Sequence, residues 1–159
     1  MALSRRAFLR GREVAIRPPW AIEEEQFVKT CSHCGDCVRL CPTQILERGQ
    51  GSFPKINFEE GECTFCGECA KNCRTKALRF SEEKPVWNLK AFISTTCLSM
   101  QGTTCRSCAE QCGEQAIHFL LQVGGIATPQ VDFNQCTGCG ACFRVCPTQS
   151  IQIKTQTTC

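Results

Sequence analysis

Apolar and polar residues alternate over several short stretches of the chain, each three or four residues long. These stretches are residues 55–58, 77–80, 116–119, 130–133 and 151–153. Alternation with a period of two is typical of a strand that buries one face, so each stretch predicts a short strand. The acidic run at residues 23–25 indicates the solvent-exposed start of a helix. The pattern as a whole predicts an α+β protein.

The sequence predicts neither a membrane-spanning helix nor a nucleic-acid binding surface. No stretch approaches the roughly 18 apolar residues that a membrane helix needs; residues 119–121 come closest, and Gln122 ends them. The 18 basic and 15 acidic residues give a net charge of +3 without a lysine tract. Proteins that read nucleic-acid sequence normally carry a stronger basic patch. We therefore expect no membrane span and no nucleic-acid partner.

Cysteine sets this chain apart, with 17 copies among 159 residues. Sixteen of them fall into four groups, and Cys159 is left over as an expected free thiol. Group one is Cys31, Cys34, Cys37 and Cys41; group two is Cys63, Cys66, Cys69 and Cys73; group three is Cys97, Cys105, Cys108 and Cys112; group four is Cys136, Cys139, Cys142 and Cys146. A similar sequence follows the last cysteine of every group. We expect a helical turn to begin near that cysteine and a strand to follow it, four times over.

Groups one, two and four have the spacing CxxCxxCxxxC, the run that ligates [4Fe-4S] clusters in bacterial ferredoxins. Thiolates at i, i+3 and i+6 wrap one corner of a cluster, and the fourth points toward a neighbouring cluster. A disulfide scaffold fits less well because the cysteine count is odd and three thiols in one tight loop pair badly. Zinc fits less well because it takes four ligands, commonly from two CxxC pairs.

Exchange of the fourth cysteine between paired motifs predicts the ligands of each cluster. The expected sets are Cys31, Cys34, Cys37 and Cys73 for cluster 1; Cys63, Cys66, Cys69 and Cys41 for cluster 2; Cys136, Cys139, Cys142 and Cys112 for cluster 3; and Cys97, Cys105, Cys108 and Cys146 for cluster 4. Cluster 4 depends on the irregular group three, in which seven residues separate Cys97 from Cys105. That group is either an enlarged loop over one cluster edge or a degraded site. The retained stretch at residues 116–119 favours a loaded site.

The repeats predict a basic arm at residues 1–25 and two ferredoxin-like modules, module 1 at residues 26–82 and module 2 at residues 86–154. A polar stretch closed by Pro85 joins the modules. Each module is too small for apolar burial alone to stabilise it well, so we expect the clusters to act as its core. Each cluster site adds about −2, and four of them take the net charge from +3 to about −5.

The first 17 residues hold five arginines against Glu13. The sequence from Ser4 to Arg10 imitates a twin-arginine export motif. Charged residues and the Pro18-Pro19 pair interrupt the apolar region that export needs, so we expect an unprocessed basic arm. A solvated tail without a role is the alternative. Trp20 follows the prolines and is expected to dock on the body or on a partner.

The remaining residues indicate no enzyme chemistry. The chain lacks a nucleophile and base constellation, a phosphate-binding glycine loop and a nicotinamide or flavin motif, so we do not expect an enzyme. His33 is expected on the loop surface, and His118 is expected to face water from its strand. Trp87 is expected to pack where the two modules join.

The chain resembles the NapF family, the ferredoxin-type accessory proteins of periplasmic nitrate reductase systems. The residues that carry the resemblance are the arm around Ser4-Arg5-Arg6, the segment leading to Trp20, the three regular groups and the irregular group in third place. The resemblance implies a cytoplasmic iron–sulfur protein that binds the nitrate reductase catalytic subunit before export and assists its maturation. Arg74 after Cys73 and Gly113 after Cys112 depart from the proline that ends a full motif.

The alternative function is general electron transfer, either as a free ferredoxin or as a subunit of a redox complex with other redox proteins as partners. Both functions need three clusters from the regular groups, and a fourth where group three is loaded. They differ in the arm, because only capture of an unexported client requires a recognition element of that kind.

Overall fold

The computed structural model describes residues 15–82, 87–122 and 124–156, and it has an α+β architecture of short elements. Its strands are β1 (Leu46–Arg48), β2 (Pro54–Ile56), β3 (Leu89–Ile93), β4 (Ile117–Leu121), β5 (Ala127–Val131) and β6 (Ile151–Thr155). Its helices are α2 (Glu24–Thr30), α3 (Asp36–Arg39), α4 (Glu68–Lys71), α5 (Ser107–Glu110) and α6 (Ala141–Arg144), with a 3-10 turn η1 (Gln50–Ser52). No helix in this part of the chain is long and apolar enough to cross a membrane.

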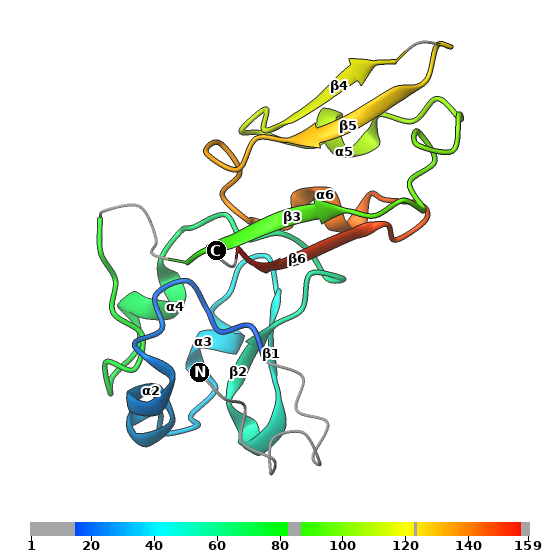
Figure 1. Cartoon of the computed structure of the whole chain (residues 1–159). Helices are drawn as coiled ribbons and strands as arrows, with labels where there is room; N and C mark the ends of the chain where they lie inside the picture. The colour runs from blue at the N-terminus through cyan, green and yellow to red at the C-terminus, as the bar shows by residue number, and fades with distance from the viewer. Residues whose placement is uncertain (1–14, 83–86, 123, 157–159) are drawn as a thin grey trace.

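The six strands form three antiparallel pairs. Strands β1 and β2 make one hairpin and β4 and β5 another, while β3 pairs with the distant β6, with Leu89 opposite Thr155. In Figure 1 the two hairpins lie at opposite ends of the molecule, and the β3–β6 pair lies between them. The long-range pair therefore closes module 2 by joining the segment before group three to the segment after group four.

Module 1 is closed in the same way, but by the amino-terminal segment. Ala21 forms an isolated antiparallel bridge with Leu78. Next to it the Ile22 N–H donates to the Ala77 carbonyl at 3.1 Å. The predicted strand at residues 77–80 is thus only a bridge, because a single pair of residues meets there rather than a run. The predicted strands at residues 116–119 and 151–153 are confirmed by β4 and β6.

The short helices do not begin where the sequence pattern placed them. Each of α3 to α6 begins within two residues after the second cysteine of its group, contains the third cysteine and ends before the fourth. A turn does begin at each fourth cysteine, where for example the Gln44 N–H donates to the Cys41 carbonyl at 3.1 Å, but it does not continue into a helix. The helix lies earlier because a left-handed residue precedes it in three groups, namely Gly35, Gly67 and Gly140. Strand β3, in a segment without clear alternation, was not predicted.

The amino-terminal segment packs on module 1 from residue 16 onward. The Ile56 N–H donates to the Ile16 carbonyl at 2.8 Å. The Arg17 guanidinium donates to Glu24 at 2.7 Å and lies 5.0 Å from the centre of the Phe27 ring. Trp20 is only 7 % exposed, so of the two predicted positions it takes the one on the body. The rest of the predicted arm, residues 1–14, lies outside the described residues, as do Cys159 and most of the predicted join.

An aromatic cluster connects the two modules. The Trp87 ring lies 5.4 Å from Phe65 and 6.4 Å from Phe58, and Phe58 in turn lies 6.3 Å from Phe143 of module 2. The indole N–H of Trp87 donates to the Thr137 carbonyl at 2.6 Å. Trp87 therefore packs between the modules, as the sequence predicted. The exact division into residues 26–82 and 86–154 stays a prediction.

Candidate functional site

Four hollows of about 330 to 390 Å³ are each lined by four cysteine thiols. Hollow 1 has Cys31, Cys34, Cys37 and Cys73; hollow 2 has Cys41, Cys63, Cys66 and Cys69; hollow 3 has Cys112, Cys136, Cys139 and Cys142; hollow 4 has Cys97, Cys105, Cys108 and Cys146. The structure thus brings together the sixteen thiols in the four sets that exchange of the fourth cysteine predicted. That each set ligates a cluster stays a prediction at this point.

The loop that carries the first three thiols of a regular group has a left-handed residue directly before its second cysteine. This residue is His33 with φ 58°, Phe65 with φ 53° and Gly138 with φ 71°. A second left-handed residue, the glycine after the second cysteine, starts the short helix that carries the third thiol. Two reversals within four residues fold the loop tightly enough for its three sulfur atoms to face one hollow.

The fourth thiol of each group sits at the start of a turn that ends in a left-handed residue three positions later. In three groups a backbone N–H from just beyond that residue donates to the sulfur: Leu78 to Cys73 at 3.4 Å, Ala116 to Cys112 at 3.3 Å and Ser150 to Cys146 at 3.2 Å. Hydrogen bonds of this kind stabilise a negatively charged sulfur. The turn therefore holds the fourth thiol toward the hollow of the neighbouring group.

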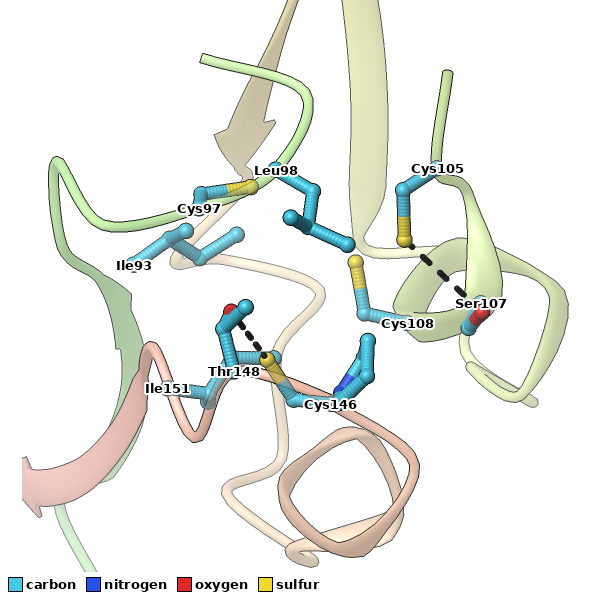
Figure 2. Close-up of a pocket in the computed structure, with 10 residues that line it drawn as sticks. Ile93, Cys97, Leu98, Cys105, Ser107, Cys108, Cys146, Thr148 and Ile151 are labelled. Atoms are coloured by element: carbon cyan, nitrogen blue, oxygen red, sulfur yellow. Dashed lines mark hydrogen bonds between the residues drawn. The ribbon is translucent and has the colours of Figure 1, made fainter. Parts of the chain in front are cut away.

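The irregular group three forms a complete set with Cys146 (Figure 2). The sulfur atoms of Cys97, Cys105, Cys108 and Cys146 point into one shared space in Figure 2. The residues between Cys97 and Cys105 form a turn of their own, in which the Thr103 N–H donates to the Leu98 carbonyl at 2.9 Å. Ser99, which is 3 % exposed, donates to the Ala127 carbonyl of β5. The loop is therefore enlarged and the four-thiol set is complete, while the loading of hollow 4 with a cluster stays a prediction.

Burial raises the pKa of the thiols that lie deepest. It raises the pKa of Cys63, Cys69 and Cys142 to about 12, and neighbouring thiols push in the same direction. Burial also acts on Cys146, but hydrogen bonds from Ser150 and Thr148 outweigh it, so the pKa of Cys146 is lowered. A buried thiol with so high a pKa stays protonated at neutral pH unless a metal cation replaces its proton, which is then released to solvent, and iron would supply that cation.

The donor set fits an iron–sulfur cage. The walls of hollows 2 and 4 consist of thiols, apolar side chains and a few hydroxyls within the described residues, and Glu114 adds a carboxylate to the wall of hollow 3. Among residues 15–82, 87–122 and 124–156, no three His, Cys, Asp or Glu side chains lie close enough together to hold one single metal ion. The sixteen cysteines are the residues that would hold the clusters, and a bound cluster would give and accept single electrons.

Two side chains near the hollows were missed or misplaced by sequence reasoning. His33 is half-buried rather than a surface residue, and its ring lies 4.2 Å from the ring of Phe53. Trp20 lines hollow 2 beside Pro19, although no sequence pattern predicts it at a cluster. His118 is exposed, as predicted. Only three-dimensional packing reveals the position of Trp20, because it comes from outside every cysteine group.

These features define an iron–sulfur protein of the ferredoxin type, and comparison with known proteins agrees. The 4Fe-4S dicluster domain matches the chain twice, at residues 30–99 and 103–150. The chain is 45 % identical to the ferredoxin-type protein NapF of Haemophilus influenzae, over 94 % of this chain and 92 % of the relative. NapF of Escherichia coli K12 is 39 % identical over 93 % and 92 %. The methylamine utilization ferredoxin-type protein MauM of Methylophilus methylotrophus is 33 % identical over 82 % and 66 %. The chain belongs to the NapF family of ferredoxin-type proteins, and it binds 4Fe-4S clusters in an electron-transfer role.

Proposed function

We propose that this chain is a cytoplasmic, four-cluster iron–sulfur protein that binds the catalytic subunit of the periplasmic nitrate reductase before export and assists its maturation. It supplies that subunit with electrons or with a cluster, and it acts as a binding and redox protein rather than as an enzyme. The observation that carries the proposal is the 45 % identity to a NapF protein along nearly the whole length of both chains.

The four equivalent hollows support the number of clusters in this proposal. Hollow 4, built by the irregular group, has about the same volume of 330 Å³ as hollow 2, which is built by a regular group. Ser99 ties its enlarged loop to the Ala127 carbonyl of β5, and Leu98 of the same loop lines the hollow beside the thiols. Four loaded hollows would give a body of net negative charge, against which a basic arm is the part best suited to bind an acidic client surface.

The position of Arg17 decides which arginines are available for such a client. Arg17 bonds to Glu24 at 2.7 Å and to the Pro54 carbonyl at 3.0 Å, so it belongs to the body. Removing it would damage module 1. The arginines left for recognition are Arg5, Arg6, Arg10 and Arg12. A truncation that tests the arm should therefore end at residue 14.

Anaerobic binding of the loaded chain to the purified, unexported catalytic subunit tests the proposal. The full chain should bind, and the chain without residues 1–14 should bind at least about tenfold more weakly because attraction by four arginines is lost. A variant with these arginines changed to Lys keeps the charge and should retain most of the affinity, whereas their change to Gln should mimic the truncation. Failure of the full chain to bind the catalytic subunit contradicts the proposal.

General electron transfer is the second candidate, and one contact favours it. The Cys63 N–H donates to the Cys139 carbonyl at 2.8 Å, which joins a residue of hollow 2 directly to a residue of hollow 3 across the two modules. A general electron carrier would reduce several unrelated acceptors at similar rates. It would also show no preference for the unexported subunit over the mature one, which the same binding measurement detects.

A further inference from the structure

Two buried side-chain nitrogens in the described part of the chain lack a hydrogen-bond partner, and both belong to residues that line a cysteine hollow. They are Nε1 of Trp20 at hollow 2 and Nδ1 of His33 at hollow 1. Native proteins rarely leave a buried polar group unpaired. The indole nitrogen always carries hydrogen and only donates, whereas the state of the imidazole nitrogen depends on its tautomer. The indole N–H of Trp20 therefore needs a hydrogen-bond acceptor, whichever tautomer His33 adopts.

The backbone and the packing fix the position of Trp20. The Arg79 N–H donates to the Trp20 carbonyl at 2.8 Å, and the neighbouring Ala21 forms the bridge to Leu78. The indole lies 5.5 Å from the ring of Phe80 and is 7 % exposed. Water and solvent anions are thus excluded from the indole nitrogen. The missing acceptor has to lie inside the protein.

Hollow 2 is the cysteine hollow that the Trp20 side chain lines. Besides Pro19 and Trp20, its wall consists of four thiols, two threonines and apolar residues: Cys41, Cys63, Cys66, Cys69, Thr43, Thr64, Pro42, Ile45, Leu46 and Ile56. None of these described groups accepts a hydrogen bond from the indole. A cluster seated among the four thiols would bring inorganic sulfides, which are acceptors, next to the Trp20 side chain.

We infer that the indole N–H of Trp20 donates a hydrogen bond to a sulfur of the [4Fe-4S] cluster in hollow 2 and raises its reduction potential. The inference rests on the cluster assigned to hollow 2 under the proposed function. Reduction adds one electron from the external donor to the cluster, and the indole keeps its proton in both states. The reduced cluster carries one more negative charge, so a donor at its sulfur stabilises the reduced state more than the oxidised one.

Module 2 shows which residue the repeated unit accepts at this position. Leu78 lies five residues after Cys73 and pairs with Ala21, and Ile151 lies five residues after Cys146 and pairs with Ile93. By this register, Trp20 corresponds to Phe92. Phe92 has no side-chain N–H, and it packs against Phe133 and Lys154 rather than lining hollow 3. Among the described residues, module 2 therefore has no counterpart to the indole donor at this register position.

The test compares the loaded, full-length chain with its Trp20→Phe variant in an anaerobic redox titration monitored by electron paramagnetic resonance. We expect the iron content to stay unchanged and the reduction potential of one cluster to fall. The expected fall is about tenfold in the equilibrium constant for reduction of that cluster, which is about 59 mV for a one-electron couple. The other couples should stay in place. Pulsed electron–nuclear spectroscopy should also lose an exchangeable proton coupled to the shifted cluster.

Trp87→Phe is the matched control. Its indole N–H already donates to the Thr137 carbonyl, and Trp87 does not line hollow 2 within the described residues. This change should leave the couple that Trp20→Phe shifts in place. If Trp20→Phe lowers the iron content through lost packing volume, a benzothienyl analogue of tryptophan at position 20 keeps the shape while removing the N–H.

Equal potentials in the chain and in either position-20 variant, at equal iron content, overturn the inference. A chain that holds no cluster among Cys41, Cys63, Cys66 and Cys69 overturns it as well. Equal potentials leave the proposed function intact, because its failure shows itself as absent binding to the nitrate reductase subunit. An empty hollow 2 would also remove one of the four clusters that the proposed function assigns, and iron content detects it separately. The two failures are therefore distinguishable.

Discussion

At the scale of single residues, backbone conformation rather than side-chain chemistry decides which positions tolerate change. The three-sulfur loops turn twice through left-handed residues, which costs an ordinary L-residue about 1–2 kcal/mol. Non-glycine residues occupy such positions at His33 and Phe65, so the loops already carry this cost. Gly140 differs because it has φ 89° and also lies directly against another side chain.

Gly140→Ala should destabilise the loaded protein by more than about 2 kcal/mol, the backbone cost alone. The added Cβ would lie 2.0 Å from the Phe58 ring, which is held in the cluster between the modules and has little room to move. Chemical denaturation under anaerobic conditions measures the loss. The control is Gly113→Ala, where an added Cβ meets nothing within 4 Å. Equal stability of the two variants would refute this reading of the loop.

At the scale of elements, the prediction of the thiol sets from the sequence was more accurate than the prediction of the helices and strands. Ligand sets follow from covalent spacing and exchange, which are local rules, and the structure brings together the same sets. Strands β4 and β6 were predicted because their apolar residues alternate. The start of α3 and the pairing of Ala21 with Leu78 were not, because they depend on left-handed backbone and on packing from outside the repeat.

The irregular group provides the sharpest test at this scale. The anaerobically purified chain should contain about sixteen iron atoms and as many sulfides, four for each hollow. Cys105→Ala should lower both by about four, because hollow 4 loses one of its thiols. Cys159→Ala should leave both unchanged, since Cys159 is the expected free thiol. About twelve iron atoms in the unchanged chain would mean that group three holds nothing.

At the scale of the whole molecule, the clusters and the fold depend on each other. Among the described residues, the largest fully buried side chains are those of Phe27, Ile45 and Leu78, together with Ser150. Many of the cysteines that line the hollows pack against this core, and burial raises the pKa of the deepest thiols so far that they are neutral without metal. Iron binding and proton release are therefore one coupled event.

Iron uptake by the metal-free chain should become more favourable as pH rises. Burial raises the pKa of Cys69 to about 12, above the value of about 8.5 for an unfolded thiol, so the folded metal-free state holds its proton more tightly. The neutral thiols stabilise the folded, metal-free chain relative to the unfolded chain. This contribution is fully present below about pH 8.5 and is lost as the pH rises toward 12. Reconstitution with limiting iron and sulfide should load more iron per chain at pH 8.5 than at pH 6.5. Less iron at the higher pH would contradict the coupling.

The pairing of β3 with β6 also sets an order in time. All thiols of hollows 1 and 2 have been synthesised once the ribosome passes Cys73, and the bridge at Leu78 follows five residues later. Module 2 has to wait for β6, at Ile151–Thr155, before β3 finds its partner. Module 1 can therefore fold and complete its two hollows while module 2 is still being translated.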